Sequence, residues 1–197
     1  MPSTNLQNIK KMIKTNSRLL VATFFMILVA GCAPQQKPEA PEASYDPEAR
    51  LKELNITLPS PPQPVANYVN GVRAGNLIFL AGKGPKYPDG RELRGKVGQD
   101  VTIEQGYDGA RMTAINQLAV LKDMLGDLKK VKRIVKVLGM VNCDPSFVEQ
   151  PAVINGFSDL MVEVFGERGR HARAAVGMAS LPRGQSVEIE LVVEVYE

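Results

Sequence analysis

The last segment of the chain largely alternates between apolar and polar side chains. One face carries Val187, Ile189, Leu191, Val193 and Val195, and the other carries Ser186, Glu188, Glu190 and Glu194. Successive side chains of a strand point to opposite faces, so this segment predicts a strand with one buried face and one open face. A sheet of such strands needs helices on its buried face, which restricts the fold to a sheet covered by helices.

The rest of the chain supplies the other elements. Segments 65–72 and 77–81 flank the turn residues Gly75-Asn76 and predict a hairpin. A capping box at Thr102 and Gln105 opens a predicted helix that ends at Gly126. Further predicted elements are a strand over 131–141, a helix that starts between 144 and 151 and ends at 166, and a strand over 172–179. The order β-β-α-β-α-β-β predicts an α+β domain with two helices on one face of a single sheet.

The N-terminus predicts export. Residues 19–30 form an uncharged, mostly apolar run behind a basic cluster, too short to span a bilayer comfortably but suited to a signal peptide. Val29-Ala30-Gly31-Cys32 then resembles a bacterial lipobox. We therefore expect a signal peptide over 1–31, lipid on Cys32, a flexible Pro- and Glu-rich linker over 33–49, and one folded domain over 50–197. An uncleaved anchor and ordinary signal cleavage are the alternatives, and Met12 is an alternative start.

The predicted location is the cell envelope. Ala33 after the lipidated cysteine resembles sorting to the periplasmic face of the outer membrane, where the lipid on Cys32 would provide the membrane contact. The formal net charge of +3 becomes −1 when the four basic residues before Cys32 are left out. The folded part therefore has no basic excess for binding nucleic acid, and we expect no nucleic-acid partner.

The sequence offers few groups for chemistry. His171 is the only histidine and Cys143 the only other cysteine beside Cys32, so we expect no metal site. Arg173 stands in a strand otherwise made of small and apolar residues, and Glu188 lies on the polar face of the next predicted strand. If those two strands pair, the two charges lie close together, either as a structural ion pair or as one functional site.

Several motifs resemble the RidA/YjgF family. They are His171-Ala-Arg173-Ala-Ala-Val, Ala179-Ser-Leu-Pro182-Arg-Gly184, Val187-Glu188-Ile-Glu190, Gly75-Asn76-Leu77-Ile78-Phe79 and Ala81-Gly82-Lys83-x-Pro85, together with Tyr68 and Asn155. The resemblance covers about residues 60–197. It implies the chorismate-mutase-like fold, a homotrimer and ligand clefts between subunits.

The resemblance also implies an activity, the hydrolysis of 2-imino or enamine acids to 2-oxo acids and ammonia without a cofactor. Arg173 would clamp the substrate carboxylate, and Glu188 would activate water. Tyr68, Asn155, Lys83 and the backbone of Ala175 would line the cleft.

This chain departs from the family pattern at four positions. Ala81 replaces a serine, Lys83 a glutamine, His171 a proline, and Ala175 a frequent cysteine. The alternative is therefore an envelope lipoprotein of the same fold that binds a small carboxylate without catalysis. A trimer with only a structural role in the envelope is a further alternative.

Overall fold

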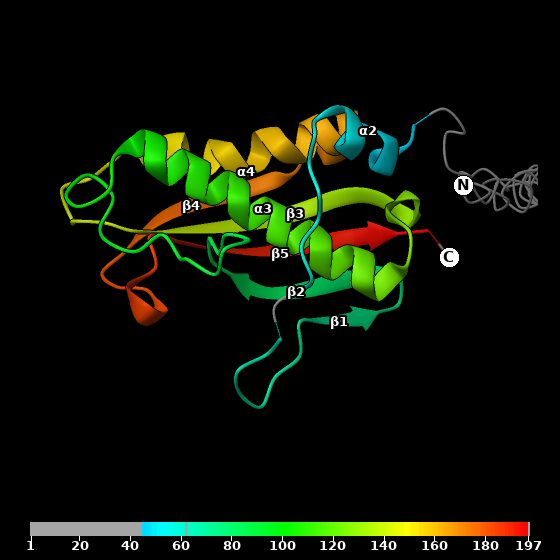
Figure 1. Ribbon diagram of the computed structural model, residues 1–197, viewed down its shortest axis with the longest axis horizontal. Helices are drawn as coiled ribbons and strands as arrows, with labels where there is room; N and C mark the ends of the chain where they lie inside the picture. The colour runs from blue at the N-terminus through cyan, green and yellow to red at the C-terminus, as the bar shows by residue number, and fades with distance from the viewer. Residues whose placement is uncertain (1–44, 62, 197) are drawn as a thin grey trace, which may run out of the picture. The chain divides into compact units, whose positions relative to one another are not determined.

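The computed structural model describes residues 45–61 and 63–196 (Figure 1). The predicted signal peptide, Cys32 and most of the predicted linker lie outside the described residues. No helix among the described residues is long and apolar enough to cross a membrane.

The core of the fold is one five-stranded sheet with the strand order β1-β2-β5-β3-β4. The strands are β1 (Gly71–Ala74), β2 (Leu77–Lys83), β3 (Val131–Asn142), β4 (Ala172–Met178) and β5 (Val187–Val195). β3 and β4 pair in parallel, and the other neighbours pair antiparallel. Because β4 lies at the edge, it pairs only with β3.

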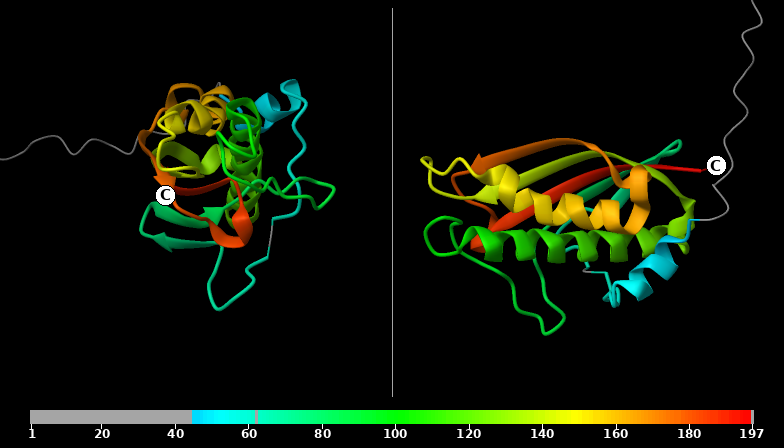
Figure 2. Two further views of the ribbon diagram at one scale, coloured as in Figure 1. Left: turned by 90° about the vertical axis from the view of Figure 1, so that its left-hand side faces the viewer. Right: turned by 90° about the horizontal axis from the view of Figure 1, so that it is seen from above.

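Two long helices, α3 (Ile103–Leu125) and α4 (Gln150–Phe165), lie side by side on one face of this sheet (Figure 2). The capping box of Thr102 and Gln105 opens α3, and Gly126 ends it in the left-handed conformation with a φ of 74°. The apolar face of β5 is buried beneath the helices, as its alternation predicts. The α+β class, the element order and the placement of both helices are therefore confirmed.

Among the described residues, nothing covers the opposite face of the sheet. This face leaves Val72, Phe79 and Val176 between 38% and 56% exposed. Their exposure follows from the described helices lying on one side of the sheet only.

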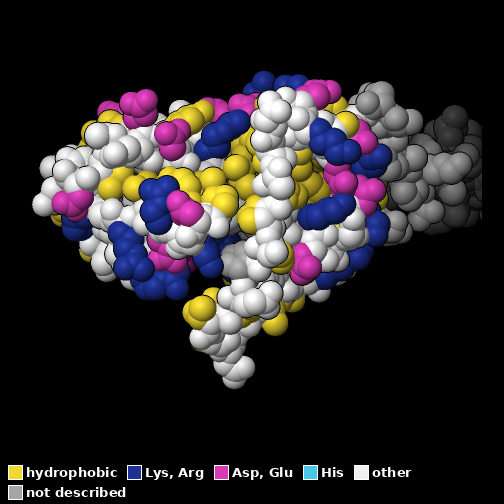
Figure 3. Space-filling model, viewed as in Figure 1, with side chains coloured by type: hydrophobic (Ala, Val, Ile, Leu, Met, Phe, Trp, Pro, Cys, Tyr) yellow, Lys and Arg dark blue, Asp and Glu magenta, His cyan; other side chains and the backbone are white. Residues whose placement is uncertain are grey.

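Described secondary structure is present before the predicted domain boundary at residue 50. Helix α2 (Pro47–Glu53) starts at Pro47, with the Asp46 carboxylate capping its first turn. Asp followed by Pro is a strong helix start, because the carboxylate accepts free N–H groups and proline fixes φ. The end of the predicted linker over 33–49 is to that extent wrong. The segment after α2 crosses α3, and hydrophobic side chains show on either side of it among interspersed charges (Figure 3).

One other boundary differs from the prediction. The first strand covers Gly71–Ala74 rather than 65–72, because residues 65–70 bend toward the end of β2. The second helix starts at Gln150, within the predicted range, and Asp144 and Ser146 form a separate turn in front of it.

Candidate active site

A cavity of about 340 Å³ opens at the end of β2. It brings together three of the predicted site residues, Tyr68, Lys83 and Glu188. Its other lining residues come from the segment before β1, the loop after β2 and the turn before β5, namely Gln63, Val65, Gly82, Gly84, Lys86, Glu92, Pro182, Arg183 and Gln185.

Glu188 lies on the face of β5 that points away from the helices. A Cβ on Gly82 would overlap its carboxylate, so the missing side chain of Gly82 makes the space in which this carboxylate lies. Burial raises the pKa of Glu188, and Glu190 adds to this, while Lys83 and Arg183 oppose it. A raised pKa makes Glu188 a better proton acceptor than an ordinary surface glutamate.

Lys83 is 7% exposed although it carries an amine. Its Nζ donates a hydrogen bond of 2.8 Å to the side-chain oxygen of Asn70 and lies 5.8 Å from the ring centre of Tyr68. Burial lowers the pKa of Lys83, against the attraction of Glu188. The pocket therefore holds an acid whose pKa is raised and an amine whose pKa is lowered.

Two amides of α3 hold the backbone around this pocket, and the sequence analysis missed both. Gln117 donates to the carbonyls of Ala81 (3.0 Å) and Ile189 (2.8 Å). Asn116 donates to the carbonyls of Gly84 (3.1 Å) and Lys86 (3.0 Å). The pairing of β2 with β5 shifts register between Leu80 and Lys83, and Gln117 satisfies carbonyls next to this bulge.

The signal for these amides was present in the sequence. Asn116 and Gln117 are adjacent polar residues on a helix whose neighbours Ala114 and Leu118 are fully buried. Buried amides need partners, so their position on an apolar helix indicates a segment of irregular backbone nearby.

The turn before β5 adds a strained residue to the pocket. Arg183 adopts a φ of 57°, which is uncommon for a residue other than glycine. Its guanidinium forms an ion pair of 2.9 Å with Glu92, which also pairs with Arg94 at 3.1 Å. This bridge ties the turn before β5 to the loop after β2.

Arg173 lies elsewhere, between the edge strand β4 and α4. Its Nη1 donates to the side-chain oxygens of Asn155 (2.9 Å) and Ser158 (3.0 Å). Ser158 Oγ is 3.1 Å from His171 Nε2, and His171 Nδ1 is 2.7 Å from the carbonyl of Gly169. That carbonyl accepts the Nδ1 proton, so Nε2 is left to accept from Ser158.

Burial lowers the pKa of His171, and the charge of Arg173 lowers it further. Two of the predicted site residues, Arg173 and Asn155, are thus in contact, and Ser158, itself next to His171, also holds Arg173. Ala175 lies two residues along the same strand and packs against the core.

The structure does not bring Arg173 and Glu188 together within one chain. β3 lies between their strands. Glu188 pairs with Met140 of β3, Met140 pairs with Val176 of β4, and Val176 is three residues from Arg173 along β4. Strand geometry then separates the two Cα atoms by roughly 14 Å. The side chains also point to opposite faces, Arg173 toward α4 and Glu188 away from it. The direct pairing of their strands, and with it the structural ion pair, is therefore wrong.

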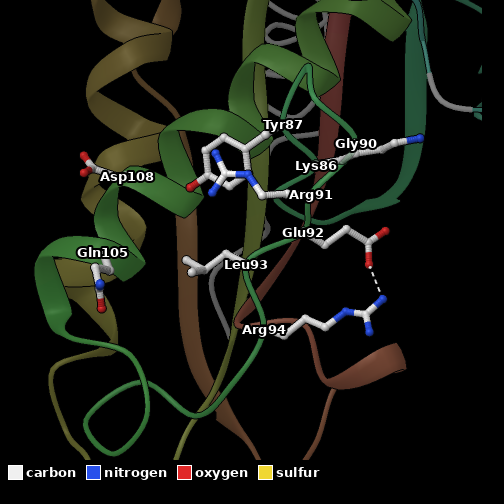
Figure 4. Close-up of a pocket in the computed structure, with 9 residues that line it drawn as sticks. All are labelled: Lys86, Tyr87, Gly90, Arg91, Glu92, Leu93, Arg94, Gln105 and Asp108. Atoms are coloured by element: carbon white, nitrogen blue, oxygen red, sulfur yellow. Dashed lines mark hydrogen bonds and ion pairs between the residues drawn. The ribbon is translucent and has the colours of Figure 1, made fainter.

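A second, larger hollow of about 840 Å³ lies between the 86–94 loop and the first turns of α3 (Figure 4). Both arginines of this hollow already have partners. Arg91 pairs with Asp89 at 2.6 Å and stacks over Tyr87, and Arg94 pairs with Glu92. Both arginines are exposed, so the smaller cavity with Lys83 and Glu188 is the better candidate site. Among the described residues, no three His, Cys, Asp or Glu side chains lie together as metal ligands.

Comparison with known proteins identifies the class of protein that this fold and pocket represent. The family described as "YjgF/chorismate_mutase-like, putative endoribonuclease" matches residues 48–195. The chain therefore belongs to the YjgF/RidA family, which confirms the resemblance of its motifs.

The matches to two related proteins extend over nearly the full length of each relative. Protein TCP17 of Trypanosoma cruzi is 44% identical over 74% of this chain and 92% of its own length. A 2-iminobutanoate/2-iminopropanoate deaminase of Dermatophagoides farinae is 29% identical over 70% of this chain and 93% of its own.

Solved structures agree on the fold. A protein of unknown function from Agrobacterium tumefaciens is 48% identical with a TM-score of 0.69, over 76% of this chain and 91% of its own. A Shewanella oneidensis protein described as a "putative endoribonuclease" is 32% identical with a TM-score of 0.73, over 76% and 99%.

Proposed function

We propose that the protein hydrolyses 2-imino or enamine acids to 2-oxo acids and ammonia. The observation that carries this proposal is the cavity in which Glu188, with its raised pKa, faces Lys83 and Tyr68. A deaminase among the relatives supports the same chemistry.

The proposed site is completed by a second copy of the chain. Arg173 is more than a side chain's length from Glu188 of its own subunit, on the other face of the sheet. A homotrimer in which Arg173 of one subunit reaches the cavity of the next would supply the missing carboxylate clamp, with Asn155 and the backbone of Ala175 beside it. The uncovered sheet face with Val72, Phe79 and Val176 gives such an assembly apolar surface to bury.

The chemistry needs little beyond positioning. Arg173 holds the carboxylate of the imino acid as a planar, bidentate fork. Glu188 accepts a proton from water as the water oxygen bonds to C2, and returns the proton to the nitrogen as ammonia leaves. An imine carbon is already electrophilic, so holding water and substrate together supplies much of the acceleration.

A complementation assay tests this arrangement directly. Imino acid is generated by an amino acid oxidase, and its decay is followed with Arg173→Ala, with Glu188→Gln, and with both variants co-expressed. Each variant alone should be inactive. If each site takes Arg173 and Glu188 from different copies, random assembly of the two variants places both residues in roughly a quarter of all sites, and activity returns to about that fraction.

The controls separate the parts of the proposal. The double variant in one chain, mixed with itself, should show no recovery. An active wild type without complementation in mixed assemblies would refute the shared site. Light scattering that gives a monomer mass for an active enzyme would refute it as well.

The alternative is a non-catalytic lipoprotein that binds a small carboxylate through Arg173. Glu188 favours the enzyme, because a clamp for an anion gains nothing from a carboxylate whose pKa is raised. The mixed charges of the pocket, with Glu92 and Glu188 among Lys86 and Arg183, likewise favour a small acid over a polyanionic strand. A wild type that binds 2-oxo acids but leaves imine decay unchanged would establish the alternative.

We also propose that this activity is tethered in the cell envelope through lipid on Cys32, on the periplasmic side of the outer membrane. The basic leader, the short apolar run and the small residues before Cys32 support this location. Metabolic labelling with a radioactive fatty acid tests it, because label should appear in the wild type and be lost in Cys32→Ser.

A further inference from the structure

Lys83 has an environment that the proposed hydrolysis does not use. It lines the cavity beside Glu188 and is 7% exposed. Its Nζ forms no ion pair with any described carboxylate, and it donates a hydrogen bond of 2.8 Å to the side-chain oxygen of Asn70. A buried lysine without a carboxylate partner is poorly stabilised as an ammonium ion.

The surroundings of Lys83 are suited to a neutral amine. A neutral amine can donate one hydrogen to Asn70 and keep its lone pair for an electrophile in the cavity. Burial lowers the pKa of Lys83, which increases the population of that neutral form. Glu188 shares the cavity and can take the proton that an attacking amine must lose.

We propose that Lys83 is a covalent catalytic residue that binds 2-imino and 2-oxo acids as a Schiff base on its Nζ. The inference rests on the proposed function for its substrate class, because the cavity is assigned to 2-imino and 2-oxo acids there. It adds a nucleophile and an enzyme-bound intermediate to the direct attack of water.

The reaction balances without any other reagent. The lone pair of Lys83 Nζ bonds to C2 of the protonated imino acid, and the π pair of the C2=N bond moves onto the substrate nitrogen. Glu188 takes a proton from Nζ and gives it to the substrate nitrogen, whose bond to C2 breaks as ammonia leaves, so that a protonated Nζ=C2 double bond forms. Water adds to C2, and as the C2–Nζ bond breaks one proton of the water passes to Nζ and the other to ammonia. The 2-oxo acid and the free amine are released. The net change is protonated imino acid plus water to oxo acid plus ammonium.

Reductive trapping of the intermediate tests the proposal. The full-length chain is incubated with pyruvate and cyanoborohydride, which reduces a Schiff base to a stable secondary amine, and labelled peptides are mapped by mass spectrometry. We expect one 1-carboxyethyl group per chain, on Lys83. Lys83→Met should lose the label, and Lys86→Met, which removes another lysine of the same pocket, should keep it.

The kinetic arm uses imino acid from an amino acid oxidase. Lys83→Met and Lys83→Arg should lower kcat by about a hundredfold or more with a small change in KM, since both lack a neutral amine near pH 7. Lys52→Met, which removes an exposed lysine of α2 outside the cavity, should stay within about twofold of the wild type. A thermal melt of each variant shows whether the fold is kept.

The outcomes distinguish this inference from the proposed function. If the wild type accelerates imine decay but carries no label, or if Lys83→Met stays active, the Schiff base is overturned and the deaminase stands. If Lys83 is labelled without acceleration of imine decay, the Schiff base stands and the deaminase is overturned. Label spread over surface lysines to the same extent as Lys83 overturns the Schiff base.

Discussion

Gly82 offers the sharpest test of where Glu188 must lie. A Cβ at this position would overlap the Glu188 carboxylate. Gly82 has no positive φ, so the backbone itself accepts alanine, and the carboxylate has to move instead. Restoring ordinary contact requires a displacement of about 1 Å, and a misplacement of this size in a catalytic group costs about a hundredfold in rate. Gly82→Ala should therefore raise the activation barrier by about 2.7 kcal/mol.

The matched control is Gly84→Ala. Its Cβ would overlap the Gln185 side-chain amide, so the steric conflict is of the same kind, but Glu188 is left in place. Both variants should lose a similar amount of stability, up to about 1–3 kcal/mol for a crowded site, measured by thermal melts. Only Gly82→Ala should lose deaminase kcat.

A second control uses the background without the carboxylate. In Glu188→Gln, adding Gly82→Ala should cost no further activity, because the group it displaces is no longer a base. Full activity of a folded Gly82→Ala, or an equal loss in Gly84→Ala, would refute the assignment of Glu188.

Four further predictions concern other parts of the molecule. Because the pKa of Glu188 is raised in the folded state, the contribution of this residue to stability is present below the ordinary glutamate pKa and is lost as pH rises through the folded-state pKa. Glu188→Gln should therefore have a higher melting temperature than the wild type at pH 7, and this difference should disappear in acid. The lowered pKa of His171 means that stability falls as pH drops below about 6.5 toward its folded-state pKa, and His171→Gln should flatten this part of a melting-temperature profile. Arg173→Lys should weaken 2-oxo acid binding, measured by calorimetry, nearly as much as Arg173→Ala, since an ammonium cannot form the fork. Gln117→Leu should lower the free energy of unfolding by about 1–3 kcal/mol in urea titrations, because two buried carbonyls lose their donor.

The sequence predicted the fold well because its signals were periodic. The alternation over 187–195, the capping box at Thr102 and the turn at Gly75-Asn76 each fix local structure without reference to distant residues. The short first strand was less predictable, because the turn from residue 65 to 70 depends on its packing against the end of β2.

The residues of the candidate site could be predicted from the sequence, but their arrangement in space could not. Motifs identified Tyr68, Lys83, Glu188, Asn155 and Arg173, and the structure places the first three in one cavity and the last two in another contact. The error was to pair β4 with β5 because they are consecutive. The order of strands in a sheet depends on which strands pair in the folded protein. The local sequences of β4 and β5 carry no signal that β3 lies between these two strands.

The hydrogen bonds of the two α3 amides also determine with which part of the fold the pocket backbone unfolds. Gln117 and Asn116 fasten the backbone from Ala81 to Lys86 to the middle of the longest helix rather than to the hairpin. Local opening of β1 and the hairpin turn therefore leaves these four hydrogen bonds intact, and the pocket backbone opens only when α3 itself leaves the sheet. In terms of cooperative folding units, the pocket segment of β2 belongs to the helix layer, although by sequence it is part of a hairpin.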